Sequence, residues 1–290
     1  MKICLGCGQR YQQENWRCPV CGWIPPQCLG FISFAPDIVA REVGFKSELF
    51  ERLRTAEERH FWFRSRNSLL AWSLQTYFPN ALSFLEIGCG SGTVLLRLRA
   101  TFPGLKLVGG DALYEGLALG RRIPGVTLFQ MDARCIPFEN EFDVIGAFDL
   151  LEHIEEDETV LRQMYRATKS GGGILVTVPQ HKWLWRPWDV LSGHRRRYFR
   201  NELVQRMEQA GFCIIRCTSF VSFLLPLILL VRLFEEKTRD PVKELKINPL
   251  LSAFLEKALT LERLLIRFGI SFPAGASLLI IAFKKARQVS

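Results

Sequence analysis

The chain has 290 residues, of which 48% are hydrophobic and 23% charged, and this composition excludes a disordered or a fibrous protein. The length accommodates one full α/β domain and a small additional module. Lysine and arginine outnumber aspartate and glutamate by 38 to 29, a formal net charge of +9. This excess favours an anionic partner: a phosphate, a carboxylate, nucleic acid or a membrane surface.

The first residues contain no apolar stretch of the kind that a signal peptide requires. The longest apolar run, Phe220–Val231, has 12 residues. As a helix it would extend roughly 18 Å, against the ~30 Å of a bilayer core. We therefore expect a cytoplasmic protein that does not cross a membrane, with a run suited to lying on the cytoplasmic face.

Four of the nine cysteines form two C-x2-C pairs, each followed by glycine: Cys4 with Cys7, and Cys18 with Cys21. Two intervening residues allow one tight turn to direct both thiolates at a single ion, and a set of four thiolates prefers zinc. Residues 1–24 are therefore predicted to form a zinc ribbon; the alternatives are two disulfides or unrelated thiols. Cys28 is expected to be a free thiol.

The stretch 25–45 is rich in proline and glycine near its start and is interpreted as a linker, with 46–290 as the main domain. Helical spacing is predicted from about residue 46 to Phe78. An apolar strand, Ser83–Ile87, then leads into three alternate glycines and a further helical pattern. Such a turn brings backbone N–H groups close to a nucleotide-like ligand. The glycine spacing alone leaves a dehydrogenase and a methyltransferase open.

Three later features separate these classes. Asp111 ends a second strand, 23 residues after Gly88, where an acid accepts hydrogen bonds from ribose hydroxyls. A third strand is followed by Asp132 and Ala133, which suit an adenine amino group and ring nitrogen. A fourth strand runs directly into Asp149.

Together, LEIGCGSGT, the acid at 111, MDARCIPF, FDVIGAFDLLEHI and GGGILVTVP resemble the class I S-adenosylmethionine-dependent methyltransferases, in the branch of ubiquinone-biosynthesis and small-molecule enzymes. The resemblance covers about 60–218 and resumes in the last strand. It implies an α/β, Rossmann-like fold: a seven-stranded, mostly parallel sheet with an antiparallel last strand. Segments 211–220 and 276–285 are the candidates for its final strands, and 221–275 is predicted to be a helical insert, a cap or a membrane-facing element.

The resemblance also implies S-adenosylmethionine as the cofactor. The predicted cofactor-binding residues are Glu86, Gly88, Cys89, Gly90, Gly92, Asp111, Ala112, Asp132, Ala133, Asp149 and Arg66. In related enzymes an arginine before the first strand meets the methionine carboxylate, and Arg64 is nearly as good a candidate as Arg66.

Methyl transfer is an in-line displacement, and an acceptor hydroxyl needs a base or a metal to remove its proton. The candidates for catalysis are His153, His181 and His194. In some quinone-pathway enzymes a group spaced like Asp149, Glu152 and His153 binds Mg²⁺. The interpretation we favour is that Glu152 and His153 cap the next helix or contact the cofactor.

The segment after the fifth strand combines three tryptophans with arginines at 195, 196, 197 and 200. Indoles beside guanidinium groups suit a substrate with an anionic head and an apolar or planar body. The segment resembles the HKWLWxxWD…GHxRRY stretch of uncharacterised bacterial methyltransferases, where it lies over the active site. The alternative for each single arginine is a solvated side chain.

The sequence thus predicts a methyltransferase for a small-molecule or lipid-linked acceptor, with oxygen as the expected acceptor atom. The alternative is an RNA methyltransferase whose zinc ribbon binds RNA. Against it, the sequence DLLEHI stands where an N-P-P-F/Y-type motif for base amines would lie, and the apolar insert does not suit an RNA-binding face. A third possibility is a cofactor-binding partner protein without activity.

Overall fold

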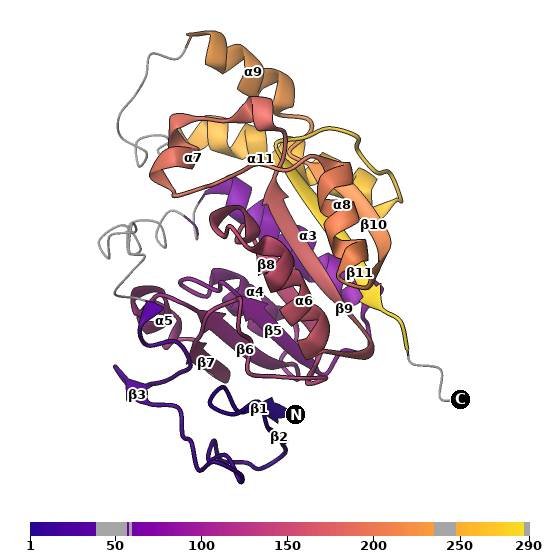
Figure 1. Cartoon of the computed structure of the whole chain (residues 1–290). Helices are drawn as coiled ribbons and strands as arrows, with labels where there is room; N and C mark the ends of the chain where they lie inside the picture. Colours follow the sequence, from indigo (N-terminus) through magenta and orange to yellow (C-terminus); the bar gives the residue numbers. More distant parts are fainter. Residues whose placement is uncertain (39–56, 58–59, 235–247, 287–290) are drawn as a thin grey trace.

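The computed structural model describes residues 1–38, 57, 60–234 and 248–286 (Figure 1). Within these residues one large sheet runs through the molecule. Its strands, in spatial order, are β10 (Phe212–Phe220), β11 (Ser277–Lys284), β9 (Thr168–Pro179), β8 (Phe142–Phe148), β5 (Ser83–Ile87), β6 (Lys106–Asp111), β7 (Val126–Gln130), β4 (Phe31–Ser33) and β3 (Gln27–Cys28). The seven strands from β10 to β7 correspond to those predicted from the sequence.

The strand directions confirm the predicted fold. Strands β7, β6, β5, β8 and β9 are mutually parallel, while β11 is antiparallel to both of its neighbours, β9 and β10. From β5 at the centre, β6 and β7 follow toward one edge of the sheet, and β8 and β9 then follow toward the other edge. In open α/β sheets, ligands bind at such a reversal, beyond the carboxyl ends of the strands.

Helices cover both faces of the sheet and bury two separate cores. Their bounds are α3 (Phe61–Tyr77), α4 (Thr93–Thr101), α5 (Tyr114–Gly120), α6 (Asp157–Ala167), α7 (Pro187–Leu191), α8 (Arg200–Gln209), α9 (Leu225–Phe234) and α11 (Pro249–Arg267). Along β8, Val144 packs into the core with α3 and α4, whereas Ile145 packs into the core with α6 and α8. This alternation follows from the period of two in a strand.

The N-terminal segment extends the sheet instead of forming only a linker. Strand β4 pairs in parallel with β7, and β3 pairs antiparallel with β4. This corrects the linker prediction for the residues that pair; residues 39–45 lie outside the described part of the chain. The cysteine-rich segment, with β1 (Lys2–Ile3) and β2 (Arg10–Tyr11), packs against the same edge through Trp16. The Trp16 ring lies 4.7 Å from Phe34 and 5.5 Å from Phe129.

The described part of the insert between β10 and β11 contains the helices α9 and α11, as predicted, and a non-helical stretch that leads from α11 to β11 and bridges to Ser219 at Phe272. Helix α11 packs along α3, and Arg64 on α3 forms an ion pair of 2.5 Å with Glu256 on α11. Among the described residues, no helix is both long enough and apolar enough to span a bilayer. The predicted helix before α3 falls on residues that, apart from Glu57, the structure does not describe.

Candidate active site

A cavity of about 770 Å³ opens beyond the carboxyl ends of β5 to β8. Its wall is built by the loops that follow four parallel strands, together with α7 and the turn after it. The predicted cofactor-binding residues that line it are Gly88, Asp111, Ala112, Asp132, Ala133 and Asp149, and His153 lines it as well. The remaining predicted residues, Glu86, Cys89, Gly90, Gly92 and Arg66, are not among its lining residues. Four of these lie in β5 or in the glycine turn that follows it.

The glycine turn has the backbone conformation that its sequence predicts. Gly88, Gly90 and Gly92 all have positive φ, at 71°, 49° and 77°. A Cβ at Gly88 would lie 2.6 Å from the side chain of Leu150, whereas a Cβ at Gly90 would meet no atom within 4 Å. At Gly88 the positive φ and the contact with Leu150 both disfavour a side chain, and at Gly90 the backbone faces open space that a ligand can approach.

Asp111 holds this turn in place. Its carboxylate accepts hydrogen bonds from the backbone N–H groups of Gly90, at 2.7 Å, and Leu113, at 2.8 Å. Burial raises the pKa of Asp111, although these N–H groups act in the opposite direction. Each carboxylate oxygen keeps one further acceptor position, which is the capacity that a ribose diol requires.

Arg66 and Asp149 form an ion pair that the sequence did not indicate. The guanidinium of Arg66 is buried and lies 2.5 Å from the Asp149 carboxylate. Glu86, whose charge the guanidinium of Arg66 acts on, is buried, and one of its carboxylate oxygens lacks a hydrogen-bond partner among the described residues. Burial raises the pKa of Glu86 well above its ordinary value, and the positive charge of Arg66 only partly offsets this.

Asp132 is likewise already partnered, by a residue not included among the predicted site residues. The backbone N–H of Arg134 donates to its carboxylate at 2.8 Å, and the Arg134 guanidinium lies 2.9 Å from it. Arg134 also lines the cavity. A short D-x-R turn is the local signal that could have identified this pair.

Two of the three predicted catalytic histidines lie together. The rings of His153 and His194 are 4.7 Å apart in an edge-to-face arrangement. Burial, and then the neighbouring His194, lower the pKa of His153 to about 4. His181 lies apart from the cavity lining, stacked on Trp183 at 4.8 Å.

His194 is oriented by Asp189, a fully buried residue in α7. The Nδ1 atom of His194 lies 2.7 Å from Asp189, and Arg197 donates two hydrogen bonds to the same carboxylate, at 2.9 and 3.0 Å. Burial alone would raise the pKa of Asp189, but His194 and Arg197 lower it. Because an ionised carboxylate can only accept, Nδ1 of His194 donates its proton to Asp189, and Nε2, on the other side of the ring, lies 4.0 Å from the carboxylate of Glu152.

The side chains of Glu152, His153 and His194 bring their possible ligand atoms within 4.8 Å of one another. Asp149, the other residue of the predicted Mg²⁺ set, is not part of this group and pairs with Arg66. Magnesium prefers an octahedron of oxygen atoms. Two imidazoles with one carboxylate do not fit that preference, so no step is assigned to Mg²⁺.

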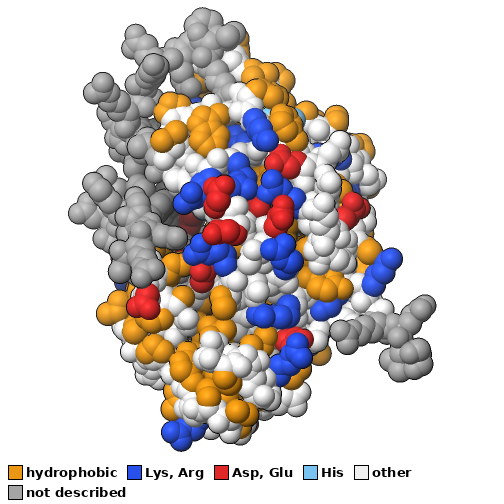
Figure 2. All heavy atoms as spheres, in the orientation of Figure 1, with side chains coloured by type: hydrophobic (Ala, Val, Ile, Leu, Met, Phe, Trp, Pro, Cys, Tyr) orange, Lys and Arg blue, Asp and Glu red, His pale blue; other side chains and the backbone are white. Residues whose placement is uncertain are grey.

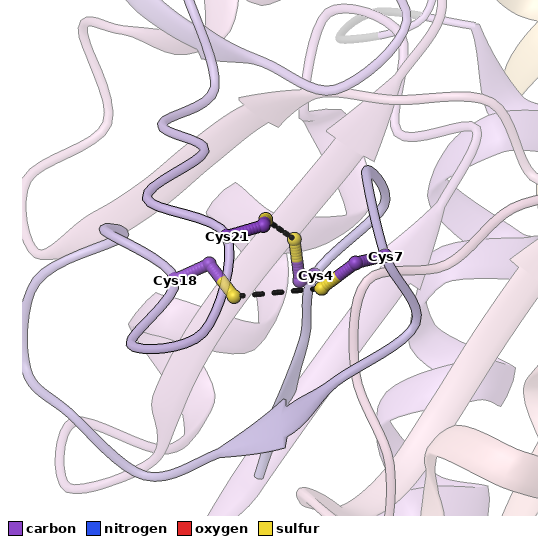
Figure 3. Close-up of side chains that lie close together, drawn as sticks. All are labelled: Cys4, Cys7, Cys18 and Cys21. Carbon is purple, nitrogen blue, oxygen red and sulfur yellow. Dashed lines mark hydrogen bonds between the residues drawn. The ribbon is translucent and has the colours of Figure 1, made fainter.

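The four N-terminal cysteines converge as predicted (Figure 3). The sulfur atoms of Cys4 and Cys21 are 3.6 Å apart, as are those of Cys7 and Cys18, and all four lie within 4.8 Å of one another. Tetrahedral zinc with bonds of about 2.3 Å places its sulfur ligands about 3.8 Å apart. The arrangement fits such an ion, and all four residues are free thiols, which the disulfide alternative does not predict.

Comparison with known proteins identifies the family. A profile described as a methyltransferase domain matches residues 53–216, more than half of the chain. The chain therefore belongs to this family, and its fold is that of the class I S-adenosylmethionine-dependent methyltransferases.

Curated relatives match part of the chain. Ajmaline N-methyltransferase of Rauvolfia serpentina is 26% identical over 152 residues, 50% of this chain and 51% of the relative. A ubiquinone/menaquinone biosynthesis C-methyltransferase, UbiE, of Pseudoalteromonas translucida is 31% identical over 141 residues, 42% of this chain and 55% of the relative. The chain spans about half the length of the curated relatives it matches.

Solved structures support the fold alone. Phosphoethanolamine N-methyltransferase 2 of Haemonchus contortus, in complex with S-adenosyl-L-methionine, superposes with a TM-score of 0.58 at 18% identity, covering 86% of this chain and 60% of the other. A complex of the Haloferax volcanii Trm112 methyltransferase activator and a methyltransferase gives a TM-score of 0.51 at 16% identity, covering 70% and 82%.

Proposed function

We propose that the chain binds S-adenosylmethionine in this cavity and transfers its methyl group to a small-molecule or lipid-linked acceptor. The observation that carries the proposal is the convergence of Gly88, Asp111, Ala112, Asp132, Ala133 and Asp149 on one cavity. These residues lie at or just beyond the carboxyl ends of four separate strands. The cavity combines an open glycine turn with carboxylates placed for a ribose and an adenine, and these are the groups of a sulfonium nucleoside.

For the acceptor we propose an oxygen atom. An acceptor hydroxyl must lose its proton as the new bond to carbon forms, and a general base supplies this. His153 lines the cavity, and His194 beside it has its Nδ1 committed to Asp189. We assign the removal of the proton to this pair of histidines. His181 remains a candidate on its sequence context alone.

For the N-terminal module we propose a structural zinc ion held by Cys4, Cys7, Cys18 and Cys21. A segment this short buries little apolar surface, so a bound ion would supply folding energy. We do not propose an RNA substrate, because the aromatic side chain of Trp16 packs against the sheet. In addition, the relatives are named for small-molecule acceptors.

The proposal is tested first by calorimetry with S-adenosylmethionine and S-adenosylhomocysteine, which should each bind with one site per chain. Failure of both to bind would refute the cofactor assignment. The protein is then incubated with methyl-labelled S-adenosylmethionine and either an aqueous metabolite extract or a total lipid extract. The fraction that takes up label identifies the acceptor class, and the alkali stability of the labelled product separates an ether from an ester.

A further inference from the structure

Helices α9 and α11 present large apolar side chains to solvent. On α9 and α11, together with the residue that follows α11, these side chains are between 39% and 84% exposed: Leu227, Leu229, Leu230, Val231, Leu250, Leu251, Phe254, Leu261, Leu264 and Phe268. Figure 2 shows hydrophobic side chains gathered at the upper end of the molecule, where Figure 1 labels α9. Large apolar side chains exposed in this number mark a candidate interaction surface.

On α11 the exposed side chains form one stripe. Leu250, Phe254, Lys257, Leu261, Leu264 and Phe268 follow one another at intervals of three or four residues, which is the period of a single helix face. The opposite side of the helix is also apolar: Leu255, Leu259 and Ile266 are buried in the core that contains residues of α3. A surface helix of a soluble domain normally carries polar residues on its outer side, so the outer stripe of α11 is built to be covered.

The charges on α11 indicate what covers it. Its exposed charged residues are Lys257 and Arg267, and both are basic. Neither of its two acids leaves a negative charge unpaired on the surface: the partly exposed Glu256 pairs with Arg64, and the buried Glu262 accepts a hydrogen bond from the backbone N–H of Phe223. A two-fold contact between two copies of this stripe would bring like charges together. An anionic lipid surface complements both the apolar stripe and the basic residues, whose long side chains reach the headgroups.

We infer that α9 and α11 dock the protein on an anionic lipid leaflet, with α11 lying in the plane of the interface. No described helix can cross a bilayer, so the protein would bind the lipid surface through this stripe and not through a spanning helix. The docking helix is also close to the site. In addition to the ion pair between Glu256 and Arg64, Arg263 of α11 donates a hydrogen bond to the backbone carbonyl of Ser65 in α3. Arg66, which follows Ser65 in the chain, pairs with Asp149 in the cavity wall.

The test is co-sedimentation of the full chain with vesicles. One set contains phosphatidylcholine only and the other an equal mixture of phosphatidylcholine and phosphatidylglycerol. We expect binding to the mixed vesicles that weakens with salt. The double variant Phe254→Glu, Leu261→Glu should bind roughly tenfold or more weakly, because two large apolar side chains leave the interface. Lys257→Glu should lower binding to the mixed vesicles only.

The matched control is Leu82→Glu, which alters a leucine that is 73% exposed in the connection between α3 and β5. It should bind as the unaltered protein does. Thermal unfolding and S-adenosylmethionine binding should stay unchanged in every variant, and these readouts separate failure of docking from failure of the proposed function. Absence of sedimentation with mixed vesicles, or equal binding by the double variant and the Leu82 control, overturns the inference. A lipid-free dimer that the double variant dissociates assigns the stripe to a second copy and also overturns it.

Discussion

Replacement of Asp111 by asparagine tests the cofactor site with little change in side-chain volume. The carboxylate accepts one backbone N–H on each oxygen, from Gly90 and from Leu113. Asparagine keeps one acceptor but turns an NH₂ group toward the other N–H, so the glycine turn loses a hydrogen bond. It also removes the charge that a ribose hydroxyl would meet. A hydrogen bond to a charged group contributes about 1.5–3 kcal/mol, which corresponds to roughly 10- to 150-fold in affinity.

Calorimetry with S-adenosylhomocysteine measures this loss directly, with Glu208→Gln, an exposed acid on α8, as the control. Burial raises the pKa of Asp111. As the pH is lowered, the affinity of the unaltered protein for S-adenosylhomocysteine should therefore begin to fall at a higher pH than if this aspartate had an ordinary pKa. The asparagine variant should lack this pH dependence. A Kd for Asp111→Asn within twofold of the control, at equal thermal stability, would show that the carboxylate does not hold the ribose.

Three further outcomes are expected. Gly90→Val should abolish cofactor binding while circular dichroism shows much of the sheet retained, because a Cβ there meets only open space; tight binding by this variant would contradict the glycine-turn assignment. Asp143→Asn should lower the free energy of unfolding by about 1 kcal/mol at neutral pH. Partial burial acts to raise the pKa of Asp143, but Lys169 and Ser83 lower it by more. The stabilisation by this carboxylate is therefore present above the pKa of an unfolded aspartate and is lost as the pH falls through the lower folded pKa. Urea unfolding measured against pH checks this, and a parallel offset at all pH values would count against it. A strong chelator should raise hydrogen exchange in residues 1–24 and lower the melting temperature; unchanged exchange there would remove the zinc proposal.

The central sheet could be predicted from the sequence because its strands carry strong local signals. Strand β5 is buried at every position and reads as a short apolar run that ends at glycine. Parallel strands buried on both faces have this pattern. The site then follows from geometry, since the carboxyl ends of neighbouring parallel strands meet at one edge. Asp111 and Asp132 could thus be placed together without knowledge of any contact.

The pairing of β4 with β7 could not be predicted in the same way. The pair joins Ile32 to Phe129, about a hundred residues apart, and β4 has only three residues. So short a strand is formed by its partner and not by its own composition, which here signals turns. The ion pair between Arg66 and Asp149 has the same origin, because side-chain partners distant in sequence leave no periodic trace.

The pair of His194 and Asp189 shows a different limit. The two residues are only five apart, yet the spacing is not that of a helix or a strand. The chain turns back at Gly193, which has a φ of 73°, and the backbone N–H of His194 donates to the carbonyl of Asp189 at 2.8 Å. The glycine indicates a loop, but the path of the loop depends on the ion pair that Arg197 forms with the buried carboxylate of Asp189. The sequence alone does not show this ion pair.

The edge strands also change what the N-terminal module contributes. Gln130, the last residue of β7, accepts from the backbone N–H of Ala35 and donates to the carbonyl of Ala112, a residue of the cavity wall. Ile38, a few residues further along, lines the cavity itself. The segment that continues from the cysteine cluster therefore forms part of the cavity wall. Disorder introduced at the cysteines would propagate through Trp16 and this edge to the cavity, so removal of the proposed zinc ion should weaken S-adenosylmethionine binding as well as unfold residues 1–24.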